Sequence, residues 1–254
     1  IVLLKARPCA WSKCTFCDYI EDNSTCTEEM IKINQDVLSH VTGEYGVLEI
    51  IDSASIFELP QPTLALIQQI IHDKNIHTLF VESHWIYHQR IQEIRDFFGI
   101  DMIVKIGVES FDDDFRNRVL NKNATFSSIE ELKKYFDSPC LMVGIQGQTK
   151  EMVQKDMDIL THHFDYGTIS IYRNNSTPIK RDESLIQWFM QNYAYLQDDP
   201  QPIHLSLSLT TLLFSVFNAP TDILEHFFTH APQFTHLSFS YIGKAIPIIP
   251  KSFI

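Results

Sequence analysis

The sequence predicts an α/β protein, a partial (β/α)6 TIM-like barrel with a short C-terminal α/β appendage. Over residues 1–199, short β-rich runs alternate six times with segments of helical periodicity. The short connections between these segments favour parallel strands joined by right-handed crossovers. The runs are mostly continuously apolar, which is typical of strands covered on both faces. A closed eight-stranded barrel would need two more strand–helix units, so we expect an open barrel.

The expected elements follow one another in chain order. Strands are expected over Ile1–Arg7, Val47–Ile51, His77–Val81, Met102–Val108, Leu141–Ile145 and Thr168–Tyr172. Helices are expected over Thr27–Val41, Pro60–His72, Tyr87–Phe98, Asp112–Leu120, Ser127–Phe136, Lys150–His162 and Glu183–Leu196. Local signals support several bounds: Thr27 can cap the first helix, Pro60 or Pro62 lies near the start of the second, and Gly99 ends the third.

After residue 199 the alternation becomes irregular. Strands are expected over His204–Leu209 and Thr235–Tyr241, around a helix over Thr221–Phe228. We therefore expect the barrel to comprise residues 1–199 and a C-terminal extension, residues 200–254, to pack on it. No flexible Gly/Ser linker separates the two parts of the sequence, so we expect one compact unit.

Charge and hydropathy argue against two classes of partner. The formal net charge is −12, and the sequence contains no run of Lys or Arg of the kind that binds a phosphate backbone. We therefore expect no nucleic-acid partner. No apolar run approaches the ~18 residues typical of a membrane-spanning helix. The opening run Ile1–Leu4 is also too short for a signal-peptide core, so we expect no membrane association.

Three of the five cysteines, Cys9, Cys14 and Cys17, are crowded into one short segment. An odd, crowded set favours metal ligation in a reducing compartment over disulfides, which predicts a cytoplasmic protein. Cys26 and Cys140 fit better as structural thiols. The crowded segment follows the first expected strand, and in barrel enzymes the loops after strands carry the chemistry. Iron–sulfur clusters usually take four cysteines, so three would leave one iron open.

The segment from Arg7 to Tyr19 resembles the signature of the radical S-adenosylmethionine superfamily. That signature places three cysteines in the loop after the first barrel strand and an aromatic residue, here Phe16, before the third. The resemblance implies that Cys9, Cys14 and Cys17 hold a [4Fe–4S] cluster whose open iron binds S-adenosyl-L-methionine. It also implies reductive cleavage of this molecule to a 5′-deoxyadenosyl radical, which abstracts a substrate hydrogen. A reducing electron donor such as flavodoxin or ferredoxin is then required.

The cysteine spacing departs from the superfamily pattern, because four residues instead of three separate Cys9 from Cys14. Either the loop carries an insertion or Cys9 is not a ligand. We favour the insertion, since Cys26 is the only nearby substitute. A zinc site that adds Cys26 or His40 is the alternative, although structural zinc sites are often built from two separated cysteine pairs.

Segments after later strands resemble the superfamily's cofactor-binding motifs. The resemblance implies that Asp52, Ser53 and Ser55 meet the amino group of S-adenosylmethionine, with a helix-capping turn as the alternative. Glu109 matches the acid that meets the ribose hydroxyls. Arg116 is a candidate for the methionyl carboxylate, as is Arg118 one turn further on, and a surface salt bridge is the alternative for one of the two.

The fifth-strand segment, Leu141 to Thr149, resembles the motif that packs on adenine. The resemblance implies that Ile145 lies against the base, and Gly147 would let the backbone approach closely.

Other strand ends at the same mouth supply candidate substrate-binding residues. Glu82, His84 and Trp85 follow the third strand, and Tyr172 and Arg173 end the sixth. Trp85 could stack on a flat ring, and Glu82 could accept hydrogen bonds from an amine or a guanidine-like edge. The alternatives are a core role for Trp85 and ordinary solvent exposure for His84, Tyr172 and Arg173.

The small size and single cluster look like the bacterial queuine-salvage lyases, which resemble the coproporphyrinogen-oxidase-like branch of the superfamily. This resemblance implies a lyase that converts the small molecule queuine to 7-aminomethyl-7-deazaguanine. A non-catalytic iron–sulfur protein, or a heme-trafficking relative of coproporphyrinogen oxidase, is the alternative.

Overall fold

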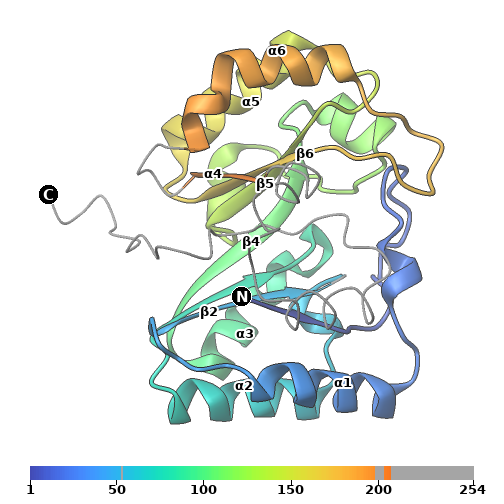
Figure 1. The fold of residues 1–254 in the computed structure, drawn as a ribbon. Coiled ribbons are helices and arrows are strands. Elements are labelled where there is room, and N and C mark those ends of the chain that lie inside the picture. Colours follow the sequence, from blue (N-terminus) through green and yellow to red (C-terminus); the bar gives the residue numbers. More distant parts are fainter. Residues whose placement is uncertain (53, 198–202, 207–254) are drawn as a thin grey trace, which may run out of the picture.

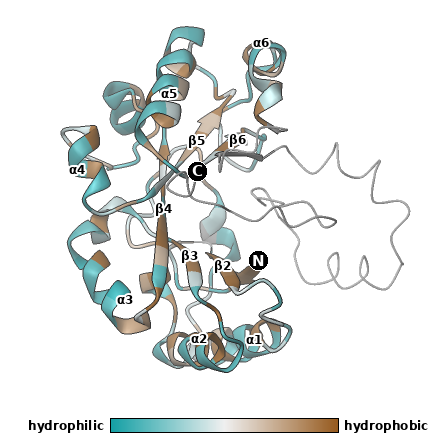
Figure 2. Cartoon of the chain, turned by 90° about the vertical axis from the view of Figure 1, so that its left-hand side faces the viewer, coloured by the Kyte–Doolittle hydropathy of each residue, from teal (hydrophilic) through white to brown (hydrophobic). Residues whose placement is uncertain are grey.

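The computed structural model describes residues 1–52, 54–197 and 203–206. They form a curved sheet of seven parallel strands in sequential order, with the helices on its outer side (Figures 1 and 2). The strands are β1 (Val2–Leu4), β2 (Val47–Asp52), β3 (Thr78–Glu82), β4 (Asp101–Glu109), β5 (Ser138–Val143), β6 (Gly167–Ile171) and β7 (Ile203–Ser206). The α-helices are α1 (Thr27–Ser39), α2 (Gln61–Asp73), α3 (Ile91–Phe98), α4 (Ile129–Lys133), α5 (Lys150–His163) and α6 (Glu183–Tyr193).

Short helical turns follow several strands and shape the mouth of the barrel. They are the 3-10 turns η1 (Tyr19–Asp22), η2 (Ile56–Glu58) and η3 (Trp85–Arg90), and the π-helical turn η4 (Phe115–Val119). A further 3-10 turn, η5 (Ala194–Gln197), directly follows α6 on the way to β7. Two of them begin at side-chain caps: Ser55 Oγ accepts from the Phe57 amide at 3.4 Å, and His84 Nδ1 accepts from the Ile86 amide at 3.2 Å.

The predicted α/β partial barrel is confirmed, with differences at the ends of elements. β1 is shorter than expected because the backbone after Leu4 leaves the sheet. The Lys5 amide donates to Asn34 Oδ1 at 2.7 Å, and the Arg7 amide donates to the Glu58 carbonyl at 3.2 Å. The helix expected over Asp112–Leu120 is a short π-helical turn.

Of the strand expected over His204–Leu209, residues 204–206 are described by the structure. They belong to β7 (Ile203–Ser206), which pairs parallel with β6 as a seventh strand of the same sheet. The elements expected over Thr221–Phe228 and Thr235–Tyr241 lie outside the described residues. The boundary near residue 199 stays a prediction.

The outer face of the sheet is apolar and packs against the helices. Alternate residues of each strand point to this face, because side chains in a strand alternate between its two sides. On β4 these residues are Val104, Ile106 and Val108, all buried, and on α2 the facing residues include Ile67 and Ile71. Each such aliphatic side chain contributes roughly 1.5–3 kcal/mol when fully buried. Figure 2 shows the same division, with hydrophobic strands inside a shell of helices that are hydrophilic outward.

The inner face of the sheet carries polar side chains at several positions. The register sets Glu82 beside Lys105, Gly107 beside Cys140, and Cys140 beside Thr168. These residues point away from the helix-packed core and line the inside of the barrel.

No helix among the described residues is long and apolar enough to cross a membrane.

Candidate functional site

The cysteine loop, defined as residues 5–18, leads from the end of β1 to η1. Cys9, Cys14 and Cys17 are partly buried free thiols in this loop. Cys14 and Cys17 lie against a small apolar cluster that is separate from the main core. The buried members of that cluster are Phe16, Phe115, Leu120, Met142, Ile145 and Tyr172. The thiols therefore rest on the ends of β4, β5 and β6.

A hydrogen bond fixes the first half of the cysteine loop to the segment after β2. The Ala10 amide, next to Cys9, donates to Glu58 Oε1 at 2.9 Å, and the Tyr87 hydroxyl donates to the same oxygen at 2.8 Å. Glu58 is buried, so these charge-assisted bonds act in a medium where they are strong.

The middle and the end of the loop are fixed to the segments after β4 and β6. The Thr15 amide donates to the Leu120 carbonyl at 3.0 Å, and the Trp11 indole donates to the Asn121 carbonyl at 2.6 Å. Beyond β6, the Asn175 side chain donates to the Phe16 carbonyl at 2.7 Å. Three parts of the sheet edge thus converge on the cysteines.

The thiols are soft donors in an apolar setting, with the Lys122 ammonium close enough to act on two of them. Burial raises the pKa of Cys14 to about 11 and that of Cys17 to about 12, and the Lys122 ammonium opposes both shifts. Charge on Cys9 also raises both of these pKa values, so the three thiols interact electrostatically. Within the described residues, no three His, Cys, Asp or Glu side chains are grouped to hold one metal ion.

Three thiols on one loop match in number and kind the ligands of an iron–sulfur cluster with one iron lacking a protein ligand, but in this structure they are not grouped around one point. Cys26 is the exposed N-cap residue of α1. At the other end of that helix, His40 Nδ1 lies 2.9 Å from the Asp36 carbonyl oxygen. The donor set therefore fits the cluster inferred from the sequence.

The segment after β4 holds the expected acid and a lysine that the sequence reasoning missed. Glu109 is buried at the strand end in a left-handed conformation, φ 65°, and its Oε1 accepts from Lys122 Nζ at 2.7 Å. Lys122 Nζ also lies 5.6 Å from the Phe16 ring centroid. A Cβ at position 107 would meet both Glu109 Oε1 and Lys122 Nζ, so Gly107 makes room for the ion pair.

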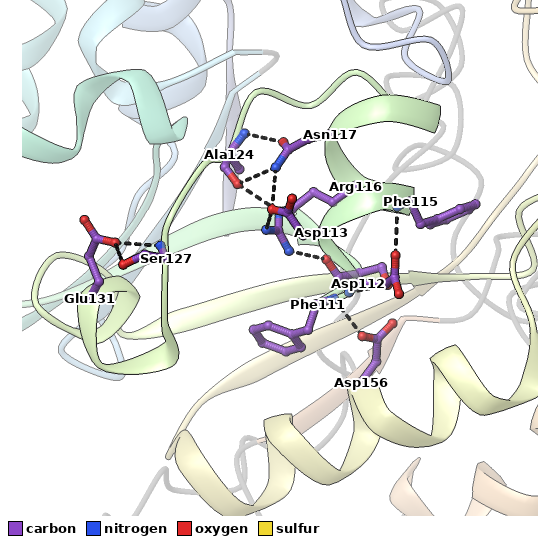
Figure 3. Close-up of polar contacts among 11 residues, drawn as sticks. Phe111, Asp112, Asp113, Phe115, Arg116, Asn117, Ala124, Ser127, Glu131 and Asp156 are labelled. Atoms are coloured by element: carbon purple, nitrogen blue, oxygen red, sulfur yellow. Dashed lines mark hydrogen bonds and ion pairs between the residues drawn. The ribbon is translucent and has the colours of Figure 1, made fainter.

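The two candidate arginines on this segment have structural partners (Figure 3). Arg116 is 1% exposed and donates to the Ala124 carbonyl at 2.8 Å, the Ser110 carbonyl at 3.0 Å and Asp113 at 2.6 Å. Arg118 is exposed and pairs with Asp114 at 2.6 Å, the surface salt bridge foreseen as the alternative. Lys122, rather than either arginine, acts electrostatically on Cys14 and Cys17.

The last residue of β2 is a buried acid with one oxygen that lacks a hydrogen-bond partner among the described residues. Asp52 Oδ1 accepts from the Ala54 amide at 2.7 Å, while Oδ2 is buried without a hydrogen-bond partner among the described residues. Burial, reinforced by Glu82, raises the pKa of Asp52 well above its ordinary value. Ser55 donates to Ser83 Oγ at 3.1 Å and so links β2 to β3. Ser53 lies outside the described residues.

Two of the expected residues after β5 and β6 belong to the apolar cluster beneath the cysteines. Ile145 and Tyr172 are fully buried there with Phe16. Gly147 has φ 92°, and among the described residues a Cβ there would meet only Phe115 Cε2, at 3.7 Å. Arg173 is partly exposed beyond β6.

The three candidates after β3 separate into different environments. Glu82 faces the barrel interior, where its Oε1 lies 3.2 Å from Lys105 Nζ. His84 Nε2 lies 2.9 Å from the Lys122 carbonyl oxygen, and burial, reinforced by Lys122, lowers its pKa to about 3. Trp85 is buried and stacks on His88 with centroids 4.4 Å apart. Trp85 therefore packs in the core, which was the alternative to a substrate-binding role.

Lys105 and Glu49 are the other residues that the sequence reasoning missed. Lys105 Nζ lies 2.7 Å from Glu49 Oε1 on the inner face. A sequence signal existed, because Lys105, Gly107 and Glu109 occupy alternate positions of an otherwise apolar strand.

Comparison with known proteins gives a strong match among solved structures. A scan of family models and a search of curated proteins find no match. The chain is 54% identical to the queuine lyase from Clostridium spiroforme bound to S-adenosylmethionine and queuine. The match covers 87% of this chain and 90% of that one, with a TM-score of 0.78. SuiB from Streptococcus suis, bound to S-adenosylmethionine, is 13% identical to this chain and matches it with a TM-score of 0.53. The match covers 82% of this chain and 49% of the SuiB chain, and at this identity it shows a shared fold alone.

We predict a pH-dependent contribution to stability from Asp156, which is buried on α5 and accepts from the Phe111 amide at 2.6 Å (Figure 3). Burial raises the pKa of Asp156 from 3.8 to about 7. Because the folded value exceeds the unfolded one, this contribution is fully present below pH 3.8 and is lost as the pH rises through about 7. Asp156→Asn should therefore gain stability relative to the wild type between about pH 5 and pH 8 in denaturant titrations. Asp158→Asn, which removes an exposed carboxylate from the same helix, is the control, and parallel profiles for wild type and Asp156→Asn would contradict the assignment.

Proposed function

The chain belongs to the queuine lyases of the radical S-adenosylmethionine superfamily, and we propose that it converts queuine to 7-aminomethyl-7-deazaguanine. The observation that carries this proposal is the 54% identity over 87% of the chain to a queuine lyase bound to both S-adenosylmethionine and queuine. The three-cysteine loop at the carboxyl edge of a parallel barrel is the corresponding feature of this molecule.

The cysteine loop supplies the chain's part in holding the cluster. Cys9, Cys14 and Cys17 would be its thiolate ligands, and Phe16 anchors the loop in the apolar cluster. When bound, the cluster and S-adenosylmethionine supply a one-electron reductive cleavage that yields the 5′-deoxyadenosyl radical. The apolar cluster and the hydrogen bonds of the loop exclude water and keep the thiols in place.

The residues around the cysteines suit the groups of S-adenosylmethionine. Glu109 is a buried acceptor for ribose hydroxyls, and Lys122 takes the role expected of Arg116 toward the methionyl carboxylate. The unpartnered Oδ2 of Asp52 is an acceptor for the ammonium. Gly147 is our candidate for the adenine side, where the lack of a side chain allows close approach, and the fully buried Ile145 would support this side from beneath.

The wider setting follows from the chemistry of this reaction. The radical requires a reductant such as flavodoxin or ferredoxin, and a reducing cytoplasm suits the free thiols. We propose that the substrate is the free base, because a net charge of −12 opposes the phosphates of a tRNA. We propose a role in queuosine salvage, because the product would be a reusable deazapurine.

We predict that the three loop cysteines are necessary for iron and the other two are not. Cys9→Ala, Cys14→Ala and Cys17→Ala should each lose the cluster, because each removes one of three thiolate ligands. Cys26→Ala and Cys140→Ala should retain close to four iron and four sulfide per chain after anaerobic reconstitution. Iron and sulfide analysis is the measurement, and full iron content in Cys9→Ala would show that Cys9 is not a ligand.

We predict that Glu109→Gln weakens S-adenosylmethionine binding while leaving the iron content unchanged. The change removes a charged acceptor and the partner of Lys122, so we expect a loss of about 1.5–3 kcal/mol in binding free energy. Asp114→Asn, which breaks an exposed ion pair nearby, is the control. Equal affinities for wild type and Glu109→Gln would remove Glu109 from the binding site.

We predict that the reduced holoenzyme forms 7-aminomethyl-7-deazaguanine and 5′-deoxyadenosine from queuine and S-adenosylmethionine, and that intact queuosine-containing tRNA is not turned over. Chromatography with mass detection measures both products. A slow formation of 5′-deoxyadenosine that is independent of queuine would reject this substrate. A cluster-bound protein with no cleavage at all would instead indicate a non-catalytic role.

A further inference from the structure

Glu58 is a buried acid that contacts the cysteine loop on both sides of Cys9. The Arg7 amide donates to the Glu58 carbonyl oxygen at 3.2 Å, and the Ala10 amide donates to Glu58 Oε1 at 2.9 Å. Cys9 therefore lies between two backbone groups that are both bonded to one residue. Glu58 is 5% exposed, so water competes little for its side-chain bond.

Cys9 depends on such an anchor more than the other two thiols of the loop do. Cys14 and Cys17 pack against the apolar cluster beneath the loop, whereas Cys9 is not one of the described residues that pack there. The segment between Cys9 and Cys14 is also one residue longer than the superfamily spacing. A longer segment has more conformations to lose, and bonds on both sides of Cys9 restrict it at the point where a ligand is needed.

The position of Glu58 is itself fixed from two directions. Glu58 ends η2, whose N-cap is Ser55, and its amide donates to the Ser55 carbonyl oxygen at 2.8 Å. From the segment after β3, the Tyr87 hydroxyl donates to Glu58 Oε1 at 2.8 Å, and its ring stacks on Phe57 with centroids 4.8 Å apart. The Arg90 guanidinium lies 4.7 Å from the centroid of the Phe57 ring. The segments after β2 and β3 thus hold the carboxylate against the loop.

The Glu58 carboxylate brings negative charge to the Cys9 side of the loop. Its Oε1 accepts two hydrogen bonds, while its Oε2 is buried without a hydrogen-bond partner among the described residues. Burial raises the pKa of Glu58, whereas its two donors and the cations Arg7 and Arg90 lower it and so favour the ionised form. Burial raises the pKa of Tyr87, and charge on Glu58 and on Cys9 adds to this shift, so both groups act on one hydroxyl.

We propose that Glu58 is a positioning residue that holds Cys9 as the third ligand of the iron–sulfur cluster and keeps the reduction potential of that cluster low. This inference rests on the proposed function, in which the cluster must reduce S-adenosylmethionine. Reduction adds negative charge, so a fixed carboxylate nearby opposes it and makes the reduced cluster a stronger reductant. The Ala10 N–H has the same effect. Bonded to Glu58, it is not free to donate to a cluster sulfur, and such donors raise the potential.

Two variants of Glu58 separate its bond from its charge in anaerobically reconstituted protein, without S-adenosylmethionine or queuine. Glu58→Gln keeps an oxygen that can accept from Ala10 but removes the charge. We therefore expect wild-type iron and sulfide content and an upward shift of the midpoint potential. Glu58→Asp keeps the charge on a side chain that is one methylene shorter. We expect a potential closer to that of the wild type and a severalfold faster loss of iron to a chelator.

A redox titration followed by electron paramagnetic resonance and a timed chelator challenge are the measurements. Glu130→Gln, which removes an exposed carboxylate from the first turn of α4, is the control and should change neither quantity, because solvent screens its charge. General damage to the barrel would alter both quantities in both Glu58 variants, whereas the inference requires a different quantity to change in each.

Three results would overturn the inference while leaving the lyase proposal intact. They are an unchanged or lowered midpoint potential in Glu58→Gln, iron loss from Glu58→Asp at the wild-type rate, and equal changes in the two variants. Wild-type protein that takes up no iron–sulfur cluster would count against the lyase proposal itself, on which the inference rests.

Discussion

The parallel order of the strands is the constraint on which the rest of this molecule depends. In a parallel sheet with sequential strand order, every carboxyl end reaches the same edge, so residues far apart in the chain meet there. The cysteine loop after β1 contacts the segments after β2, β4 and β6 for this reason. Apolar outer faces buried against helices fix the sheet, and the inner face is then free to carry charge.

Charge on the inner face is arranged in layers by the strand register. Toward the mouth, Glu109 and Lys122 neutralise one another above Gly107. One layer deeper, Lys105 faces two glutamates. Two charged layers in one small barrel are expensive in free energy, because each ion loses its hydration. Such a cost is typical of sites whose electrostatics serve binding rather than folding.

Much of the fold could be predicted from periodicity, and much of the site could not. The first six strands lie close to their expected ranges because both kinds of signal, apolar runs and caps, are local. The apolar cluster of Phe16, Ile145 and Tyr172 brings three expected residues together. The surroundings of Arg116 and Trp85 could not be predicted from the sequence. A buried arginine bonded to backbone carbonyls, or a tryptophan stacked in the core, has no distinguishing sequence signal. Lys122 was missed because its place beside the cysteines is set by the path of the chain after β4 rather than by any period.

The anchoring of the cysteine loop has a mechanical consequence. Glu58, after β2, and Asn175, after β6, form hydrogen bonds to the loop from the two sides of the open barrel, so the loop connects these two sides. Curvature of the sheet and order in the loop are then thermodynamically linked, as metal sites and folding often are. Loss of either hydrogen bond would free one end of the loop, so that the loop would no longer connect the two sides of the barrel.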